Sequence, residues 1–246
     1  MVKKLYSDSY ARFYNLSFTG EGCGMEKKRI TIIVGHYGTG KSEFSVNYAI
    51  NESKEHNRVA LIDLDNLNMY FRSREVRELL EKHGIRVIGS QIETPAVDVP
   101  TVSAEAYAPL QDESYRLLID VGGNMQGARP LRLYTEYLTD NYDMYYVLNA
   151  NRPETQNLEQ NLQFINEIEG MSGLKLSGIV NNTHLLKSTS PEDVIRGNKL
   201  ALEVAEKKGV PIIYNTAISS VVDGLPKDIK GEIFPMELFL RKDWMS

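Results

Sequence analysis

One short stretch constrains this chain more than any other. The apolar run Ile30–Val34 leads into Gly35–Ser42 (GHYGTGKS), which matches the pattern G-x-x-x-x-G-K-[ST] at every fixed position. A helical pattern begins near Ser42. Glycines let the backbone wrap so that successive N–H groups converge on phosphate oxygens, and the following helix points its positive end at the same anion. The sequence therefore predicts a strand, a phosphate-binding loop and a helix, in that order.

The residues of this loop have separate expected tasks. Lys41 should reach the β- and γ-phosphates of a nucleotide, and the Ser42 hydroxyl should bind Mg²⁺. The whole stretch is expected to contact the nucleotide: Gly35, His36, Tyr37, Gly38, Thr39, Gly40, Lys41, Ser42 and Glu43.

Short β-branched runs alternate with helical patterns along the rest of the chain. Most runs are continuous and apolar, which is typical of strands buried on both faces of a parallel sheet. Ser190-Pro191 and Gly209 mark the two ends of one intervening helix. Repeated units of this kind predict an α/β three-layer sandwich with a mostly parallel sheet of seven or eight strands. The expected strands are Ile30–Val34, Val59–Asp63, Ile85–Ile88, Leu117–Val121, Met144–Leu148, Leu176–Val180 and Pro211–Tyr214.

Length, charge and cysteine content narrow the class of protein. The 246 residues carry a formal charge of −5, so no nucleic-acid partner is expected. The single Cys23 excludes an internal disulfide and a cysteine-based metal cluster within one chain. No apolar run reaches the roughly 18 residues of a membrane helix, so we expect no integral membrane segment and a cytoplasmic protein.

The sequence predicts a short N-terminal appendage followed by one folded domain. Residues 1–28, rich in Ser, Tyr, Gly and Lys, indicate a flexible N-terminal appendage, and residues 29–246 form the nucleotide-binding domain. Met25 as the true start is a hypothesis. The segment Gln91–Asp112 holds three prolines and little periodicity, which indicates either a plain surface loop or a functional loop, over the active site or for binding a partner. The apolar tail Phe234–Trp244 is either a docked C-terminal segment or a membrane-surface helix.

Acidic residues end two of the expected strands. Asp120 closes an apolar run and is followed by Gly122–Gly123, so it is expected to hold Mg²⁺ through water. Asp63 and Asp65 lie two residues apart at the end of another run and would point the same way if the strand continued. They could position the attacking water or bind the Mg²⁺ shell. The alternative is that Asp65 only forms a turn.

The set GHYGTGKS, LIDLD and LLIDVGG, in that order and separation, resembles the MinD/ParA/CobQ-type branch of P-loop NTPases over roughly residues 29–217. The resemblance implies ATP and Mg²⁺ as ligands, often with a nucleotide-dependent homodimer. It puts Asp120 and Ser42 at the metal and makes Lys41, Asp63 and Asp65 the catalytic set. It also implies that an Asn ending a later strand reads the nucleobase. We favour Asn182, with Asn181 as the alternative and a purely structural Asn as a third reading.

This chain departs from the resembled pattern beside the first loop glycine. Many members carry a second lysine there, which reaches across a dimer, and this chain has His36. His36 is either a phosphate or metal contact or a packing residue of the loop. Arginines that could neutralise charge on the γ-phosphate are Arg72, Arg74 and Arg129, each with a surface role as the alternative.

Three functions fit these observations. We favour a Mg²⁺-dependent ATP-binding protein, an ATPase that acts as a nucleotide-driven switch or accessory factor for a protein partner. The first alternative is an ATP-dependent small-molecule enzyme, a carboxylate-activating ligase or kinase resembling dethiobiotin synthetase. The second is a nucleotide-binding scaffold that does not hydrolyse. ATP rather than GTP is implied by the resemblance, and the sequence holds no N-K-x-D pattern for guanine.

Overall fold

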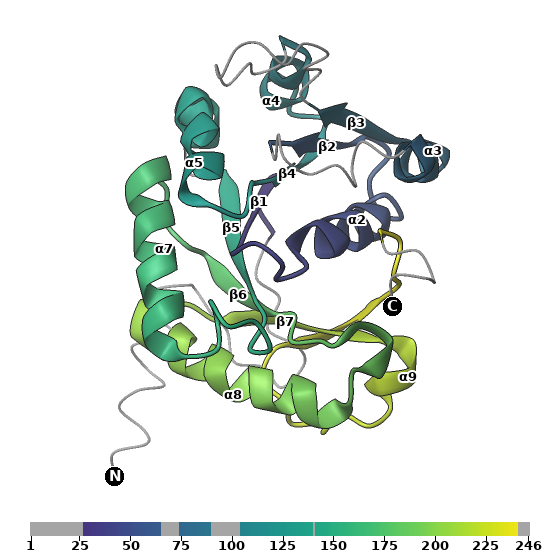
Figure 1. Cartoon of the computed structure of the whole chain (residues 1–246). Coiled ribbons are helices and arrows are strands. Elements are labelled where there is room, and N and C mark those ends of the chain that lie inside the picture. Colours follow the sequence, from purple (N-terminus) through teal and green to yellow (C-terminus); the bar gives the residue numbers. More distant parts are fainter. Residues whose placement is uncertain (1–26, 65–73, 90–103, 140, 241–246) are drawn as a thin grey trace, which may run out of the picture.

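Eight parallel strands form one sheet at the centre of the molecule (Figure 1). The computed structural model describes residues 27–64, 74–89, 104–139 and 141–240. The order across the sheet is β3-β2-β4-β1-β5-β6-β7-β8. The predicted α/β architecture is therefore confirmed, with eight strands. They are β1 (Ile30–Val34), β2 (Val59–Asp63), β3 (Ile85–Gly89), β4 (Arg116–Asp120), β5 (Tyr142–Leu148), β6 (Gly178–Asn181), β7 (Ile212–Ile218) and β8 (Glu232–Met236).

Strand β1 lies in the middle of the sheet, between β4 and β5. The chain leaves β1 toward β2 on one side, and later crosses from β4 over to β5 on the other. Ligands of open α/β sheets bind at the carboxyl ends of the strands where the order reverses in this way. The loop after β1 therefore occupies the position at which a ligand is expected.

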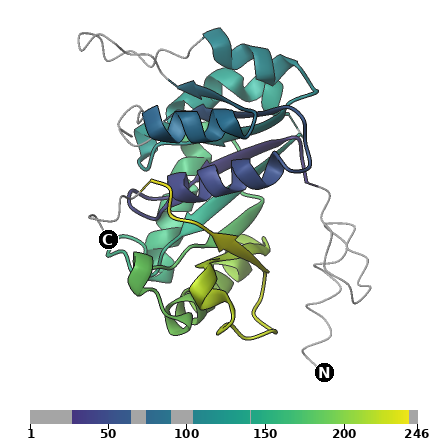
Figure 2. The same cartoon turned by 90° about the vertical axis from the view of Figure 1, so that its right-hand side faces the viewer.

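Helices cover both faces of the sheet (Figures 1 and 2). On one face lie α2 (Lys41–Glu52) and α3 (Arg74–Lys82), and on the other α5 (Met125–Ala128), α7 (Leu158–Ser172) and α8 (Pro191–Lys208). Successive side chains of β1 point to opposite faces of the sheet. Ile32 packs in the hydrophobic core beneath α7, and Ile33 packs in the core beneath α2. The smaller helical segments are η1 (Ala104–Ala106), α4 (Tyr107–Gln111), η2 (Arg129–Tyr134), α6 (Thr135–Leu138), η3 (Leu186–Ser188) and α9 (Ser219–Val222).

The helix signals of the sequence located α8 well, whereas the strand signals missed the end of β7 and all of β8. Ser190 caps α8 and Gly209 ends it with φ 68°. Strand β7 runs on to Ile218, beyond the expected end at Tyr214, because buried polar residues break its apolar run. Strand β8 overlaps the start of the tail Phe234–Trp244, and no strand was expected there.

Strand β6 begins two residues later than expected. The backbone N–H groups of Lys175 and Leu176 donate to the Tyr142 hydroxyl and the Glu169 carboxylate, at 2.8 and 3.0 Å. These groups are therefore satisfied by side chains, and pairing with β5 begins only at Gly178.

The expectation of an irregular Gln91–Asp112 segment is partly wrong. Residues 104–111 form η1 and α4, in which Pro109 and Leu110 are buried, while residues 91–103 lie outside the described residues. Most of the predicted appendage, residues 1–26, also lies outside them. Its last residues contact the domain: Lys27 Nζ lies 3.1 Å from Glu52 Oε1, and the Lys28 N–H donates to Asp143.

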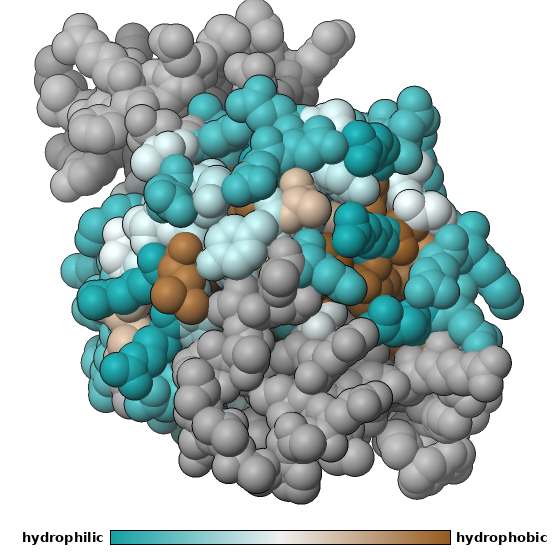
Figure 3. Space-filling view, turned by 90° about the horizontal axis from the view of Figure 1, so that it is seen from above, coloured by the Kyte–Doolittle hydropathy of each residue, from teal (hydrophilic) through white to brown (hydrophobic). Residues whose placement is uncertain are grey.

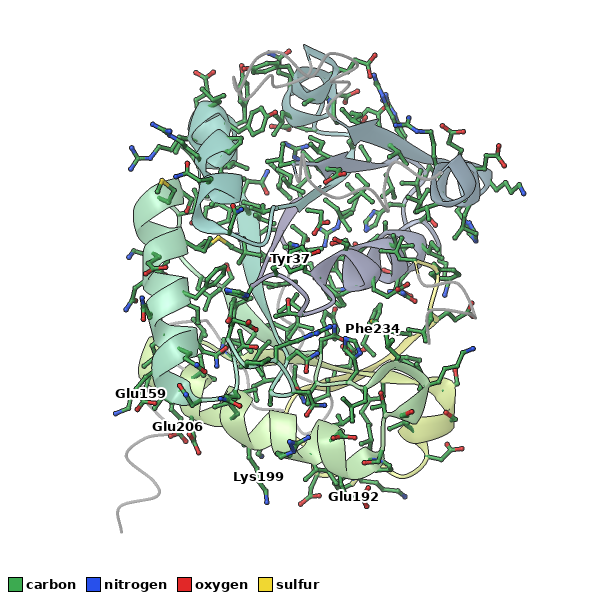
Figure 4. All side chains as sticks on the ribbon, in the orientation of Figure 1. Tyr37, Glu159, Glu192, Lys199, Glu206 and Phe234 are labelled. Atoms are coloured by element: carbon green, nitrogen blue, oxygen red, sulfur yellow. The ribbon has the colours of Figure 1, made fainter. Side chains whose placement is uncertain are left out.

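Hydrophilic residues cover most of the described surface on the face shown in Figure 3, with hydrophobic residues in a few small areas. Charged side chains on α7 and α8, among them Glu159, Glu192, Lys199 and Glu206, point away from the body of the molecule (Figure 4). No helix in the described ranges is long and apolar enough to cross a membrane.

Candidate functional site

Glycines shape the loop between β1 and α2. Gly38 and Gly40 have φ values of 78° and 83°, in the left-handed region that side chains disfavour. Gly35 packs so closely that a Cβ would lie 2.7 Å from the Val147 carbonyl oxygen. The Thr39 hydroxyl closes the turn by donating to the His36 carbonyl at 2.9 Å. These glycines and this hydrogen bond therefore hold the loop in a curled form.

The loop after β4 lies against this first loop. The Tyr37 N–H donates to the Gly123 carbonyl at 2.9 Å, and a Cβ on Gly123 would lie 3.2 Å from Lys41 Nζ. Tyr37 lies beside the start of α2 in Figure 4, and its side chain is 74% exposed. The His36 ring packs against Phe164, with ring centroids 5.1 Å apart, so His36 has a packing contact in this structure.

Asp120 is buried at the carboxyl end of β4 and binds two hydroxyls of α2. Ser42 Oγ donates to one carboxylate oxygen at 2.8 Å, and Ser45 Oγ donates to the other at 3.0 Å. A donating hydroxyl still has oxygen lone pairs available for a cation. Mg²⁺ prefers oxygen ligands, usually one or two from protein groups together with waters and phosphates. The oxygens of Ser42 and Asp120 therefore fit a Mg²⁺ ion.

The other predicted acids and arginines are only partly described. Asp63 ends β2 directly beside Asp120, because the two residues are partners in the parallel ladder. Paired residues point to the same face, so the Asp63 carboxylate shares the α2 side of the sheet. Asp65 and Arg72 lie outside the described residues, as does the Arg74 side chain. Arg129 is exposed at the start of η2.

The two asparagines at the end of β6 have different partners. Asn182 is buried, its amide nitrogen donates to the Thr39 carbonyl at 2.7 Å, and its amide oxygen accepts from the Thr216 hydroxyl. Asn181 points elsewhere, because its amide nitrogen donates to Val194 and Asn215, each at 2.9 Å. Asn182 thus joins the glycine loop to β7, whereas Asn181 belongs to the packing of α8.

Glu43 faces the segment that follows β8. Its carboxylate accepts the backbone N–H groups of Phe239 and Leu240, at 2.5 and 3.1 Å. Asn47, one turn along α2, exchanges two hydrogen bonds with the backbone of Glu237. We call residues 237–240 the C-terminal strap. Figures 1 and 2 show it running from β8 alongside α2, where the Glu43 carboxylate holds it. Glu43 also lines the cavity, and its predicted contact with a nucleotide stays a prediction.

A cavity of about 840 Å³ extends from the glycine loop toward β8. Its walls come from the loop, from the segments after β5 and β6, from the last residues of β7 and β8, and from the strap. Most residues of the other walls were not expected in the site, among them Arg152, His184 and Thr216. These three lie at or after the carboxyl ends of strands on the β5 side of β1, so their place in the cavity can be recognised only when the order of the strands is known.

Solved structures resemble this chain, although no protein-family model and no curated protein matches it. Cell division protein FtsY from Thermotoga maritima is 19% identical, with a TM-score of 0.53 over 84% of this chain and 67% of that chain. Chloroplast FtsY from Physcomitrella patens is 17% identical, with a TM-score of 0.51 over 85% and 65%. This chain thus spans about two thirds of their length.

The parallel sheet, the loop after β1 and these neighbours define the fold as that of the P-loop NTPases. At such identities the likeness shows the fold alone and does not separate one branch of the class from another. The finer resemblance to the MinD/ParA/CobQ type therefore stays a prediction.

Proposed function

We propose that this chain is a Mg²⁺-dependent ATP-binding protein, an ATPase that acts as a nucleotide-driven switch for a protein partner. The observation that carries the proposal is the buried bond between Asp120 and the Ser42 hydroxyl, at 2.8 Å, directly beside the left-handed glycine loop. Glycine-loop N–H groups, a lysine and an oxygen pair suited to Mg²⁺ together are the parts that phosphoryl-transfer sites use.

In this proposal each part acts on a different portion of the nucleotide. The loop backbone and the first turn of α2 bind the phosphates, and Lys41 offsets their negative charge. Mg²⁺, when bound by Ser42 and Asp120, supplies charge neutralisation between the phosphates. We propose that Asp63 and Asp65 orient the attacking water; the position of Asp63 next to Asp120 in the sheet supports this.

A switch needs an element that both the nucleotide and a partner can bias. The loop at Gly122–Gly123 is a candidate, because Tyr37 of the glycine loop binds its backbone and Lys41 lies beside it. ATP binding would fix this loop, and hydrolysis would release it. A homodimer that forms only with nucleotide remains part of the proposal, with His36 in place of the lysine that the resembled family uses.

ATP is proposed over GTP on the resemblance and because the sequence has no N-K-x-D pattern. Calorimetric titration with ATP and GTP, with and without Mg²⁺, together with light scattering for mass, tests the proposal. We expect Mg²⁺-dependent binding that favours ATP, with a larger mass in its presence. A persistent monomer that binds ATP would argue against the dimer, and binding of GTP alone would overturn the choice of base.

The metal role has its own test. Asp120→Asn should weaken the Mg²⁺ dependence of ATP binding and leave the fold intact, because an amide keeps the shape but loses the charge. Asp112→Asn is the matched control. Asp112 is a partly exposed acid just before the amino-terminal end of β4, whereas Asp120 lies at its carboxyl end. An identical Mg²⁺ requirement in wild type and Asp120→Asn would move the metal elsewhere.

A further inference from the structure

Arg152 is fastened to the glycine loop from the neighbouring strand. Its Nε donates to the Gly38 carbonyl at 2.7 Å, and a Cβ on Gly38 would lie 3.2 Å from the guanidinium carbon. The guanidinium therefore rests on the bare glycine backbone. Gly38 also has a φ of 78°, so two separate features of this position exclude a side chain.

A tight turn after β5 holds Arg152 in place. The Arg152 N–H donates to the Asn149 carbonyl at 3.1 Å, and the Thr155 N–H donates back to the Arg152 carbonyl at 3.0 Å. The buried Thr155 hydroxyl donates to the Asn149 carbonyl at 2.7 Å. The backbone of Arg152 is therefore fixed by bonds that do not involve its side chain.

Among the described residues, the charge of Arg152 has no acidic partner. Within these ranges no carboxylate lies within ion-pair distance of its guanidinium, which donates a hydrogen bond to the Gly38 carbonyl. The side chain is half-buried and lines the cavity. A planar cation in this situation can hold the face of an aromatic ring, because guanidinium groups are weakly hydrated and stack on π systems.

The order of the strands indicates which part of a bound nucleotide, the phosphates or the ribose and base, would lie beside Arg152. The metal oxygens follow β4, on one side of the glycine loop, and Arg152 follows β5, on the other side. The cavity continues from Arg152 toward Asn182 after β6 and Ala217 in β7. Phosphates held at the loop and Mg²⁺ thus leave the ribose and base to lie on the Arg152 side.

We infer that Arg152 is a specificity-determining residue whose guanidinium stacks on the purine ring of the bound nucleotide. The inference rests on the proposed nucleotide site and adds how the base is held. Arg152 therefore contributes to holding the base, whereas the loop binds the phosphates. Adenine and guanine both offer a π face, so the inference holds for either base.

Titrations with ATP, GTP and ribose 5-triphosphate, all with Mg²⁺, test this assignment. Ribose 5-triphosphate has the same phosphates and sugar but no base. Arg152→Ala should weaken binding of the preferred purine nucleotide roughly tenfold and change binding of ribose 5-triphosphate less than twofold. Arg152→Lys should weaken purine nucleotide binding almost as much as Arg152→Ala, because an ammonium group keeps the charge but has no planar face to stack on the base. Arg58 is an exposed arginine directly before β2, at the amino-terminal ends of the strands and away from the cavity. The Arg58→Ala variant should therefore bind all three ligands like wild type.

The possible outcomes separate the two proposals. An equal loss for ribose 5-triphosphate would mean that Arg152 supports the loop or binds phosphate, and would overturn the stacking assignment. Unchanged purine affinity in Arg152→Ala would overturn it as well. A wild-type protein that binds none of the three ligands would overturn the proposed function itself, before any variant is compared.

Discussion

The two ends of the proposed site, the phosphate end and the base end, are built in different ways. The proposed phosphate end consists of consecutive residues, Gly35–Ser42, completed by Asp120 from the adjacent strand. The proposed base end takes its walls from the segments after β5 and β6, from the carboxyl end of β7, and from the strap. In the proposal, local backbone geometry decides phosphate binding, and long-range packing decides which base fits. A change at one end should alter a different property from a change at the other.

The largest expected effect comes from breaking the phosphate end. Lys41→Ala removes the charge that offsets the phosphates, so ATP turnover should fall by roughly 100- to 1000-fold. Steady-state phosphate release together with calorimetry measures it. Lys175→Ala is the matched control, because the Lys175 side chain is 82% exposed and lies outside the cavity. Unchanged affinity and rate in Lys41→Ala would refute the assignment of the loop.

The next largest effect is expected at Gly40, where the glycine loop contacts the Asn182 side chain of the proposed base end. At Gly40 a Cβ would lie 2.4 Å from Asn182 Nδ2 and 2.9 Å from His184 Nε2, with φ 83°. Gly40→Ala should therefore lower the free energy of unfolding by about 2–4 kcal/mol, from backbone strain and a displaced buried hydrogen bond. Urea denaturation measures it.

Gly173→Ala separates the two causes. Gly173 has a similar φ of 77°, but nothing lies within 4 Å of its would-be Cβ. It should cost only the strain, about 1–2 kcal/mol. Equal losses in the two variants would mean that the contact with Asn182 adds nothing, and the two ends would then be independent.

The sequence allowed the phosphate end to be predicted because its information is local. The glycines, Lys41 and Ser42 are adjacent in the chain, and Asp120 is marked by the apolar run before it. The α/β architecture followed from the apolar runs in the same way, since strands buried on both faces leave a composition signal.

The base end could not be predicted in the same detail. Arg152 follows β5 in a polar turn that resembles many surface loops, and its importance comes from β5 lying next to β1. Strand β8 was missed because its exposed alternate residues dilute the apolar signal. The contact of Glu43 with the strap could not be predicted for a related reason, since its partners, Phe239 and Leu240, lie nearly 200 residues away. Strand order and terminal packing are properties of the whole chain.

Substitutions of Asn182 and Asn181 should have smaller effects on stability than Gly40→Ala, and they separate an effect on stability from an effect on nucleotide binding. Both are buried and make two hydrogen bonds or more, so changing either to Ala should lower the free energy of unfolding by about 1–3 kcal/mol. Only Asn182 contacts the glycine loop and lines the cavity. Asn182→Ala alone should therefore also weaken nucleotide binding. Weaker binding in Asn181→Ala to the same degree would show that affinity follows stability and not the site.

The smallest effect concerns the helix cap behind the base end. Ser190 follows Thr189 of the cavity wall, and its side chain exchanges hydrogen bonds with Asp193 across the first turn of α8. Ser190→Ala should cost about 1 kcal/mol of stability near neutral pH. It should leave binding of ribose 5-triphosphate unchanged, because the phosphate end has no contact with this cap.

The cost of Ser190→Ala should depend on pH in a defined direction. Burial raises the pKa of Asp193, but hydrogen bonds from Ser190 and Arg196 outweigh it and hold the pKa below the ordinary value of 3.8. A carboxyl whose pKa is lowered by folding stabilises the protein above its unfolded pKa and loses that contribution as the pH falls through the folded pKa. The difference between wild type and Ser190→Ala in urea unfolding should therefore be full at pH 7 and shrink below about pH 4. A difference that stays constant down to pH 3 would mean that the Ser190 hydroxyl caps the helix without stabilising the charge of Asp193.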